Sequence, residues 1–599
     1  MRKFFLSVGV VVIMFATFAT VSCQKDDGIE FREQSALTLL PLDSIEHIIP
    51  PGPIVSVVDD MALVRKLENP YSVVNMRLAY DGMSDVFEDV GLEEDDITTT
   101  HFYVKFKPDN EEELQLLKQR YLDYDIYEYP LDYEMSGRVS YHDPSLPDTV
   151  PTYQYMSIDS LAWNTIARPE NVDFEVLERL YIPDEDLDID ISACATRSGT
   201  LSYEEAIELL VNESMRLTGN LEDEEIDGNG TMGSNDKWYP SGRITAYDDI
   251  VDGQVPLQGV KVRARRWFTT RKAYTDADGY FQFDKGFKKK VKYSIVWDGD
   301  GWNIREGQLG QAYYRGPEQK GAWNLEIAND GYKSVRYAAI HRAVYRYKKG
   351  NIYGLSRIND LFCTNICYAH KYNDGVVADY NREWGMSLFC DIRIFGKKDE
   401  NTFRDISEII GIAYHELGHA AHYTNQISRY IDSSAELRES WASFTGYYLT
   451  LKEYQELGFP NGPFDVLWVS DAYGYMRRVG LKPDYHLNRQ LTEIVDGEEY
   501  LPIFIDMYDN DNQHIVNVAY DDNLQSKLLL FSNDEIHDIP ADVIEDFVFN
   551  SNGVMETKSK LTNFLNSNTA TTNSQYGLTW QNILNLYTPY MDNPVIVYP

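Results

Sequence analysis

Residues 413–425 read AYHELGHAAHYTN and place three histidines and one glutamate within a few turns of chain. At about 100° per residue, the angular step of an α-helix, the surrounding segment 406–424 separates into two faces. The apolar face consists of Ile406, Ile409, Ile410, Ala413, Leu417, Ala420 and Ala421. The opposite face consists of Glu408, Gly411, His415, Gly418, His419 and His422. The pattern predicts an amphipathic helix whose apolar stripe packs against a core.

His415 and His419 lie one helical turn apart, so both imidazoles can reach a single ion. Glu416 lies about 100° around the helix from His415, beside the metal position. In this His-Glu-x-x-His arrangement the histidines bind zinc and the glutamate acts as general base. The alternative is a surface helix whose histidines have other partners. His422 is expected near the site rather than as a ligand.

A catalytic zinc usually has three protein ligands and one open position for water. A third histidine on the same motif is excluded, because its glycine position is His422 and its last histidine position is Asn425. The following segment, SSAELRESWASFTGYYL (433–449), predicts a second helix with Ser433 or Ser434 as N-cap. That helix offers two carboxylates, Glu436 and Glu439.

Glu439 stands twenty positions after His419 and is followed by Ser-Trp-Ala. This spacing resembles that of the gluzincins, the thermolysin-like zinc peptidases whose third ligand is a glutamate on the next helix. The resemblance implies that His415, His419 and Glu439 bind one Zn²⁺ and that Glu416 is the base. Glu436 is the rival ligand. The position one turn beyond Glu439, often an acid or amide in that family, is Ser443 here.

Such a ligand set lowers the pKa of a zinc-bound water toward neutrality, and a neighbouring carboxylate can take its proton. Glu416 would then pass that proton to the leaving amine. A donor must also stabilise the oxyanion. The candidates are Tyr447 and Tyr448 on the second helix and His486 in KPDYHLNR, which loosely resembles the thermolysin-type donors. Tyr447 and His486 are therefore predicted to be catalytic, with Glu416.

Just upstream, MSLFCDIRIFG (386–396) alternates like a strand that ends at Gly396. In the gluzincins such a strand borders the cleft, and an extended peptide adds to its edge. An ordinary internal strand is an equal alternative.

The chain has 599 residues, 43% of them hydrophobic, and is predicted to form three or four domains of a multidomain α+β protein. Residues 1–22 have the layout of a secretory signal. Thr20-Val21-Ser22-Cys23 resembles a bacterial lipobox, and the next four residues, QKDD, resemble the signals of surface lipoproteins of Bacteroidetes type. We therefore expect lipidation of Cys23 and an outer-membrane, cell-surface location, or secretion if Cys23 is not lipidated.

Without residues 1–22, 53 basic and 95 acidic residues leave a net charge of −42. This charge argues against nucleic acid and anionic lipid surfaces as partners, so a membrane is expected only through the anchor. The expected partner is a protein or glycoprotein substrate, and no partner chain is predicted. For an exported protein, a Cys363–Cys367 or a Cys367–Cys390 disulfide is plausible, with Cys194 also present.

Six segments are predicted: a signal peptide (1–22), a tether (23–60), a small acidic α/β domain (61–195), a helix with an acidic linker (196–236), a β-sandwich (237–330) and the metallopeptidase domain (331–599). In the α/β domain, a strand at 101–107, a helix at 110–121 and a further strand form a βαβ unit that resembles the pro-domains of secreted peptidases. A spacer or adhesion domain is the alternative. Ser202 and Glu205 predict a capping box for the helix.

Residues 241–297 resemble the carboxypeptidase regulatory-like β-sandwich, a transthyretin-like module, through Pro-Leu-Gln-Gly (256–259) and Thr-Asp-Ala-Asp-Gly-Tyr-Phe (275–281). The second motif predicts a tight turn rather than a calcium loop. The acidic segment 502–513 could bind Ca²⁺, with a solvated loop favoured. The catalytic domain is expected to be largely helical after residue 400.

Together these features predict a zinc-dependent hydrolase of peptide bonds in extracellular proteins or glycoproteins. The alternative is a non-enzymatic binding or adhesion lipoprotein with a structural or scavenging metal site. Glu416 separates the two, because hydrolysis needs that carboxylate and metal storage does not.

Overall fold

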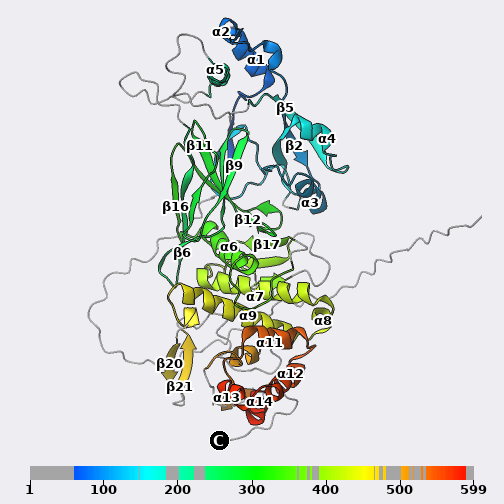
Figure 1. Cartoon of the computed structure of the whole chain (residues 1–599), viewed down its shortest axis with the longest axis vertical. Coiled ribbons are helices and arrows are strands. Elements are labelled where there is room, and N and C mark those ends of the chain that lie inside the picture. Colours follow the sequence, from blue (N-terminus) through cyan, green and yellow to red (C-terminus); the bar gives the residue numbers. More distant parts are fainter. Residues whose placement is uncertain are drawn as a thin grey trace, which may run out of the picture.

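The computed structural model describes ten segments together with four short strands between residues 466 and 529. The segments are 60–88, 90–147, 149–183, 202–220, 237–359, 363–373, 378–380, 390–464, 501–510 and 535–587. Cys23, Cys194 and His486 lie outside them. The chain is a mixed α+β protein, as predicted, with the N-terminal elements at one end, a β-sandwich next to them and helices at the other end (Figure 1). Among the described helices, none is both long and apolar enough to cross a membrane.

The N-terminal region contains two small sheets. The first pairs β1 (Ala62–Lys66) with β3 (Tyr133–Ser136), and the second has the order β4 (Gln154–Asp159), β2 (His101–Lys107), β5 (Asp173–Leu180). The helices of this region are α1 (Val73–Asp81), α2 (Ser84–Glu88), η1 (Glu94–Asp96), α3 (Glu111–Arg120) and α4 (Ser160–Thr165).

The predicted first strand and helix are β2 and α3, but the predicted βαβ unit is wrong. After α3 the chain enters the other sheet through β3, and both neighbours of β2 are antiparallel to it. Helix α3 therefore does not cross between two parallel strands, which is what a βαβ unit requires.

Helix α5 (Tyr203–Leu217) begins with the predicted capping box, in which the Ser202 backbone N–H donates to Glu205 Oε2 at 2.7 Å. It is not a separate linker helix. Its buried Ala206 and Leu210 belong to the same core cluster as Met76 of α1. We therefore assign α5 to the N-terminal region.

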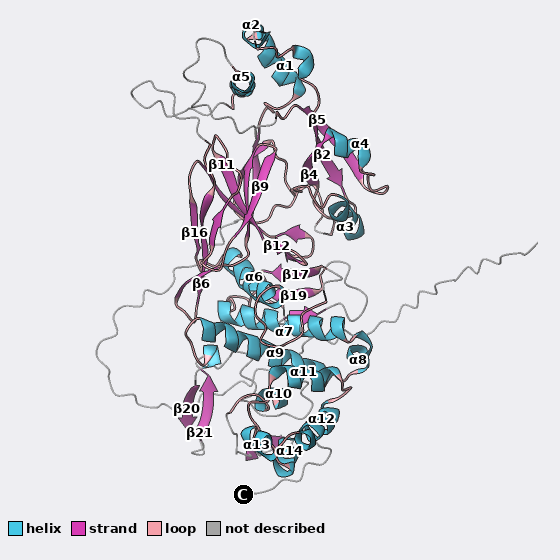
Figure 2. Cartoon of the chain, in the orientation of Figure 1, coloured by secondary structure: helices cyan, strands magenta, loops and turns pink. Residues whose placement is uncertain are grey.

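The β-sandwich has two four-stranded sheets that face each other (Figure 2). One contains β10 (Tyr280–Gln282), β6 (Ser241–Asp248), β16 (Trp323–Ile327) and β7 (Gly253–Pro256). The other contains β15 (Tyr313–Gln319), β11 (Val291–Val296), β8 (Lys261–Arg266) and β9 (Thr269–Tyr274). In the predicted tight turn, Asp276 accepts the backbone N–H groups of Asp278 and Tyr280 at 3.0 and 2.8 Å.

A third, six-stranded sheet has the order β12 (Asp298–Gly299), β13 (Trp302–Glu306), β17 (Thr364–Ala369), β19 (Ile392–Phe395), β18 (Ala378–Tyr380), with β14 (Gly310–Gln311) beside β13. Strands β13, β17 and β19 are parallel, and β18 is antiparallel to β19. Residues 298–311 thus join the sheet of the predicted catalytic domain, although they precede the predicted boundary at residue 330. The segment predicted as the β-sandwich therefore contributes three strands, β12, β13 and β14, to the sheet of the predicted catalytic domain.

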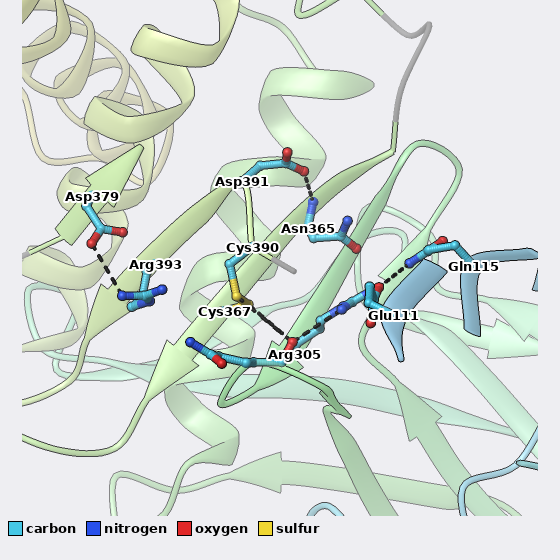
Figure 3. The surroundings of a disulfide bond; sticks show 10 residues. Glu111, Gln115, Arg305, Asn365, Cys367, Asp379, Cys390, Asp391 and Arg393 are labelled. Atoms are coloured by element: carbon cyan, nitrogen blue, oxygen red, sulfur yellow. Dashed lines mark hydrogen bonds and ion pairs between the residues drawn. A yellow bond between two sulfur atoms is a disulfide. The ribbon is translucent and has the colours of Figure 1, made fainter. Parts of the chain in front are cut away.

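Strand β19 corresponds to the strand predicted to border the cleft, but it lies inside the sheet, with β17 on one side and β18 on the other. Among the described strands, β18 is the edge strand on this side of the sheet. A disulfide joins Cys367 of β17 to Cys390, with a Cα–Cα distance of 5.8 Å, and so confirms one of the two predicted pairings (Figure 3). This disulfide closes the loop of chain between Cys367 and Cys390, which contains β18. Cys363 is a free, exposed thiol.

The helices that follow the sandwich are α6 (Ser334–Lys348), α7 (Ile406–Asn425), α8 (Ile427–Asp432), α9 (Ala435–Glu456), α10 (Ile503–Asp506), α11 (Ala541–Phe549), α12 (Val554–Ser567), α13 (Ala570–Gln575) and α14 (Trp580–Tyr587). The shorter elements are η4 (Gly462–Phe464), β20 (Val466–Ser470), β21 (Met476–Gly480), β22 (Asn517–Val518) and β23 (Leu528–Leu529). One continuous core runs from the sandwich through α6, α7 and α9 to the C-terminal helices.

Candidate metal centre

Helix α7 carries the His-Glu-x-x-His motif and is held at its N-terminus by the β-sandwich. The Ser407 backbone N–H and hydroxyl donate to the two carboxylate oxygens of Asp249, which follows β6, at 2.7 and 2.9 Å. This bond satisfies one of the N–H groups that the first helical turn leaves without an intrahelical partner. The predicted helix is confirmed, but both of its faces are buried, because α6 and α9 pack against it as well as the sheet.

Helix α9 runs back along α7 after the short helix α8. Its N-cap is Ser434, whose hydroxyl accepts the Leu437 backbone N–H at 3.3 Å. The two long helices approach closely at Gly418, where an added Cβ would lie 2.9 Å from the Cβ of Thr445. This small residue lets the second turn of α9 reach the histidines of α7.

The three predicted ligands come together at this crossing. Glu439 Oε2 lies 3.3 Å from His415 Nε2 and 3.4 Å from His419 Nε2. One ligand atom from each residue lies within 4.8 Å of the others, and no other group of histidine, cysteine and acidic side chains in the described part of the chain does so. The rival ligand Glu436 is exposed in the first turn of α9 and lies outside the group.

These distances fit a shared zinc ion. Two ligands of a tetrahedral zinc, each at about 2.0–2.2 Å, lie about 3.4 Å apart, whereas a charge-assisted hydrogen bond is about 2.7–2.9 Å long. The two spacings in the structure, 3.3 and 3.4 Å, match the first value. Two imidazole nitrogens and one carboxylate oxygen are also the donors of one type of catalytic zinc site.

The electrostatic balance keeps Glu439 ionised. Burial raises the pKa of this carboxyl, but the charges and hydrogen bonds of His419 and His415 outweigh burial and hold the pKa well below its ordinary value. The ionised carboxylate is the form that binds a cation, whereas the two histidines must be neutral to bind it.

Glu416, the predicted base, follows His415 directly on α7 and is 2% exposed. Tyr447 is buried on α9, with its ring 4.7 Å from that of Phe464, and its predicted role at the oxyanion stays a prediction. Tyr448 donates its hydroxyl to the Tyr353 carbonyl at 3.1 Å, so this donor is engaged elsewhere. The predicted calcium segment begins as α10, with Ile503–Asp506 buried.

Two tyrosines beside the histidines were not foreseen. The Tyr430 hydroxyl lies 3.2 Å from His419 Nδ1, and the Tyr380 ring stacks over the His419 ring at 6.3 Å between centroids. No motif marks either residue among the 44 tyrosines of the chain. Tyr380 lies on the edge strand β18, so this strand runs next to the candidate site.

His422 is fully buried one turn after His419, with its ring stacked on Phe549 at 4.6 Å and 6°. Neither of its ring nitrogens has a hydrogen-bond partner among the described residues. Burial, together with the charges of His419 and Arg438, lowers the pKa of His422 to about 3. We conclude that His422 is a neutral core residue beneath the site.

No protein-family model and no curated protein matches this sequence. The interpretation of the site therefore depends on its geometry and donor chemistry.

Proposed function

We propose that this chain is a zinc-dependent peptidase in which His415, His419 and Glu439 bind the ion and Glu416 is the general base. The observation that carries the proposal is the convergence of three donor atoms, in which Glu439 Oε2 lies at the spacing of tetrahedral zinc ligands from both histidine nitrogens, on a motif that also supplies a buried carboxylate.

A bound zinc ion would supply Lewis acidity, which polarises the scissile carbonyl and lowers the pKa of water. Glu416 then takes a proton on its carboxylate and passes it to the nitrogen of the leaving amine. Because Glu416 is buried in a region of low dielectric, its charge acts strongly on groups close to it. Tyr447 and His486 remain the predicted donors to the oxyanion.

The substrate class is supported by the position of β18. This strand pairs with β19 on one side and, among the described strands, has no neighbour on the other. It also carries Tyr380, which stacks on a ligand histidine. An extended peptide can add to such an edge through backbone hydrogen bonds. A protein or glycoprotein substrate and a surface location through lipidated Cys23 stay predictions.

The test uses Glu416→Gln, which keeps the size of the side chain and removes the base. We expect near-stoichiometric zinc by elemental analysis, and cleavage of a denatured protein substrate to fall by about 100-fold or more. Glu439→Ala should lose zinc and cleavage together. Glu436→Ala, an exposed acid on the same helix, is the matched control and should keep both. Unchanged cleavage by Glu416→Gln would show that this residue is not the base.

A further inference from the structure

Tyr430 connects the short helix α8 to the candidate metal centre. It is fully buried, and its hydroxyl oxygen lies 3.2 Å from Nδ1 of His419. The other ring nitrogen, Nε2, faces Glu439 at 3.4 Å. The two nitrogens of this imidazole thus have different neighbours: a phenol on one side and the other candidate ligand on the opposite side.

A neutral imidazole carries one N–H group, and only its second nitrogen can bind a metal. If Nδ1 carries the proton, it donates to the Tyr430 oxygen and leaves the Nε2 lone pair directed at Glu439. We propose that Tyr430 is a positioning residue, which accepts this hydrogen bond and fixes both the tautomer and the ring plane of His419. This inference rests on the proposed function, because it assumes that His419 is a ligand.

The position of Tyr430 is itself fixed by several contacts. The Arg438 guanidinium lies 5.3 Å from the centre of the tyrosine ring and donates to the Tyr430 and Ser433 carbonyls at 3.3 and 2.8 Å. The His422 ring meets the tyrosine ring edge-on at 4.9 Å. Arg438 directly precedes Glu439 in α9. One turn of this helix therefore supplies the candidate ligand Glu439 and also the arginine that holds Tyr430 in place.

The partner is a phenol, which adds no charge at neutral pH. Orientation is therefore what the contact supplies, rather than additional negative charge at the ion. Hydrogen-bond partners of histidine ligands fix the ring and typically change metal affinity by about 10- to 100-fold when they are removed.

The chain offers a matched control in Tyr423. Its ring belongs to the same aromatic group, 5.5 Å from Tyr430 and 6.0 Å from Tyr380, and it is half-buried. Tyr423→Phe removes a hydroxyl from this group without touching the His419 contact, whereas Tyr430→Phe removes the hydroxyl that makes it.

The experiment measures zinc dissociation constants of the full chain by competition with a chromophoric chelator, for wild type, Tyr430→Phe, Tyr423→Phe and Glu439→Ala. We expect Tyr430→Phe to bind zinc about 10- to 100-fold more weakly and Tyr423→Phe to stay within about twofold of wild type. The visible spectrum of the Co²⁺-substituted protein gives a second readout, because its bands report ligand geometry; they should shift in Tyr430→Phe and not in Tyr423→Phe.

An unchanged zinc affinity and Co²⁺ spectrum in Tyr430→Phe would overturn the inference while leaving the proposed function intact, provided that wild type binds zinc and Glu439→Ala does not. Equal weakening by both tyrosine variants would also overturn it, since the effect would then belong to the aromatic packing. Failure of wild type to bind zinc would reject the proposed function itself. Melting of the metal-free variants shows whether each remains folded at the titration temperature.

Discussion

Helices α7 and α9 carry two buried polar clusters that differ in how their charges are arranged. The donor cluster consists of His415, His419 and Glu439. The paired cluster consists of Tyr414, Glu453, Arg342, Asp248 and Tyr454. In the paired cluster, Arg342 bonds Asp248 at 2.7 Å and Glu453 at 2.9 Å. Hydroxyl groups complete it, from Tyr414 to Glu453 at 2.6 Å and from Tyr454 to Asp248 at 2.8 Å.

The two clusters differ in the charges that surround their carboxylates. In the paired cluster each carboxylate meets the Arg342 guanidinium and a tyrosine hydroxyl at hydrogen-bonding distance, and Arg346 adds a second cation 3.9 Å from Glu453, so that two cations face two carboxylates. In the donor cluster three lone-pair donors converge, and Glu439 Oε2 lies at the longer spacing of 3.3–3.4 Å from the two histidine nitrogens, which suits a shared cation. Tyr414 and His415 are neighbours in sequence, yet they serve different clusters because one residue is about 100° of rotation on a helix.

The largest expected effects come from removing one carboxylate from each cluster, that of Glu453 or that of Glu439. Glu453→Gln leaves Arg342 paired with Asp248 alone and takes one acceptor from the buried Arg342 and Tyr414 donors, so it should cost about 3 kcal/mol of unfolding free energy. Zinc affinity should be unchanged in this variant. Glu439→Ala should weaken zinc binding by at least about 100-fold, an effect that Glu453→Gln should not show. Both variants are measured by urea unfolding and by zinc titration. The prediction is contradicted if Glu453→Gln weakens zinc binding or if Glu439→Ala binds zinc as tightly as wild type.

A smaller effect is expected where the two helices touch. Gly418→Ala places a Cβ 2.9 Å from the Cβ and 3.0 Å from the Oγ1 of Thr445, so α9 must shift. Such overpacking should cost about 1–3 kcal/mol and should also weaken zinc binding, because Glu439 moves with α9.

Gly82→Ala is the control for this substitution, because its added Cβ meets nothing closer than 3.6 Å. Thermal melting and zinc affinity are measured for both variants. Equal stability of the two would show that α7 and α9 can separate without cost.

The smallest expected effect concerns pH and His422. Because burial lowers the pKa of this histidine to about 3, its contribution to stability is present above the unfolded pKa of about 6.5 and is lost as pH falls toward 3. Between pH 6.5 and 5, the contribution of His422 to the loss of stability should be about 2 kcal/mol. His422→Leu should show a shallower slope of unfolding free energy against pH, measured by urea titration. A slope equal to that of wild type would mean that His422 does not titrate on unfolding.

Local features were predictable because short-range geometry determines them. The phase of α7, the spacing of His415 and His419 and the capping residues Ser434 and Ser202 depend on residues within a few positions of one another. The choice of Glu439 over Glu436 came instead from the resemblance to the gluzincins, and the packing of α9 beside α7 brings Glu439 to the histidines.

Features that join distant segments were missed or wrong. Strand β13 pairs with β17, more than fifty positions later, and β19 is covered by β18, which precedes it in sequence. The contact of Asp249 with the start of α7 joins residues 158 positions apart and was also missed. The contact between Tyr430 and His419 spans only eleven positions, but it depends on how α8 folds against α7.

The sequence by itself therefore determined the chemistry that α7 carries and the helix that supplies the third donor. Tertiary structure alone decided which strand forms the open edge, which cysteines pair and which tyrosine meets His419. The physical reason is that a helix repeats every 3.6 residues and so shows its faces in the sequence. Pairings across dozens of residues depend instead on how whole layers pack, and they leave no periodic trace in the chain.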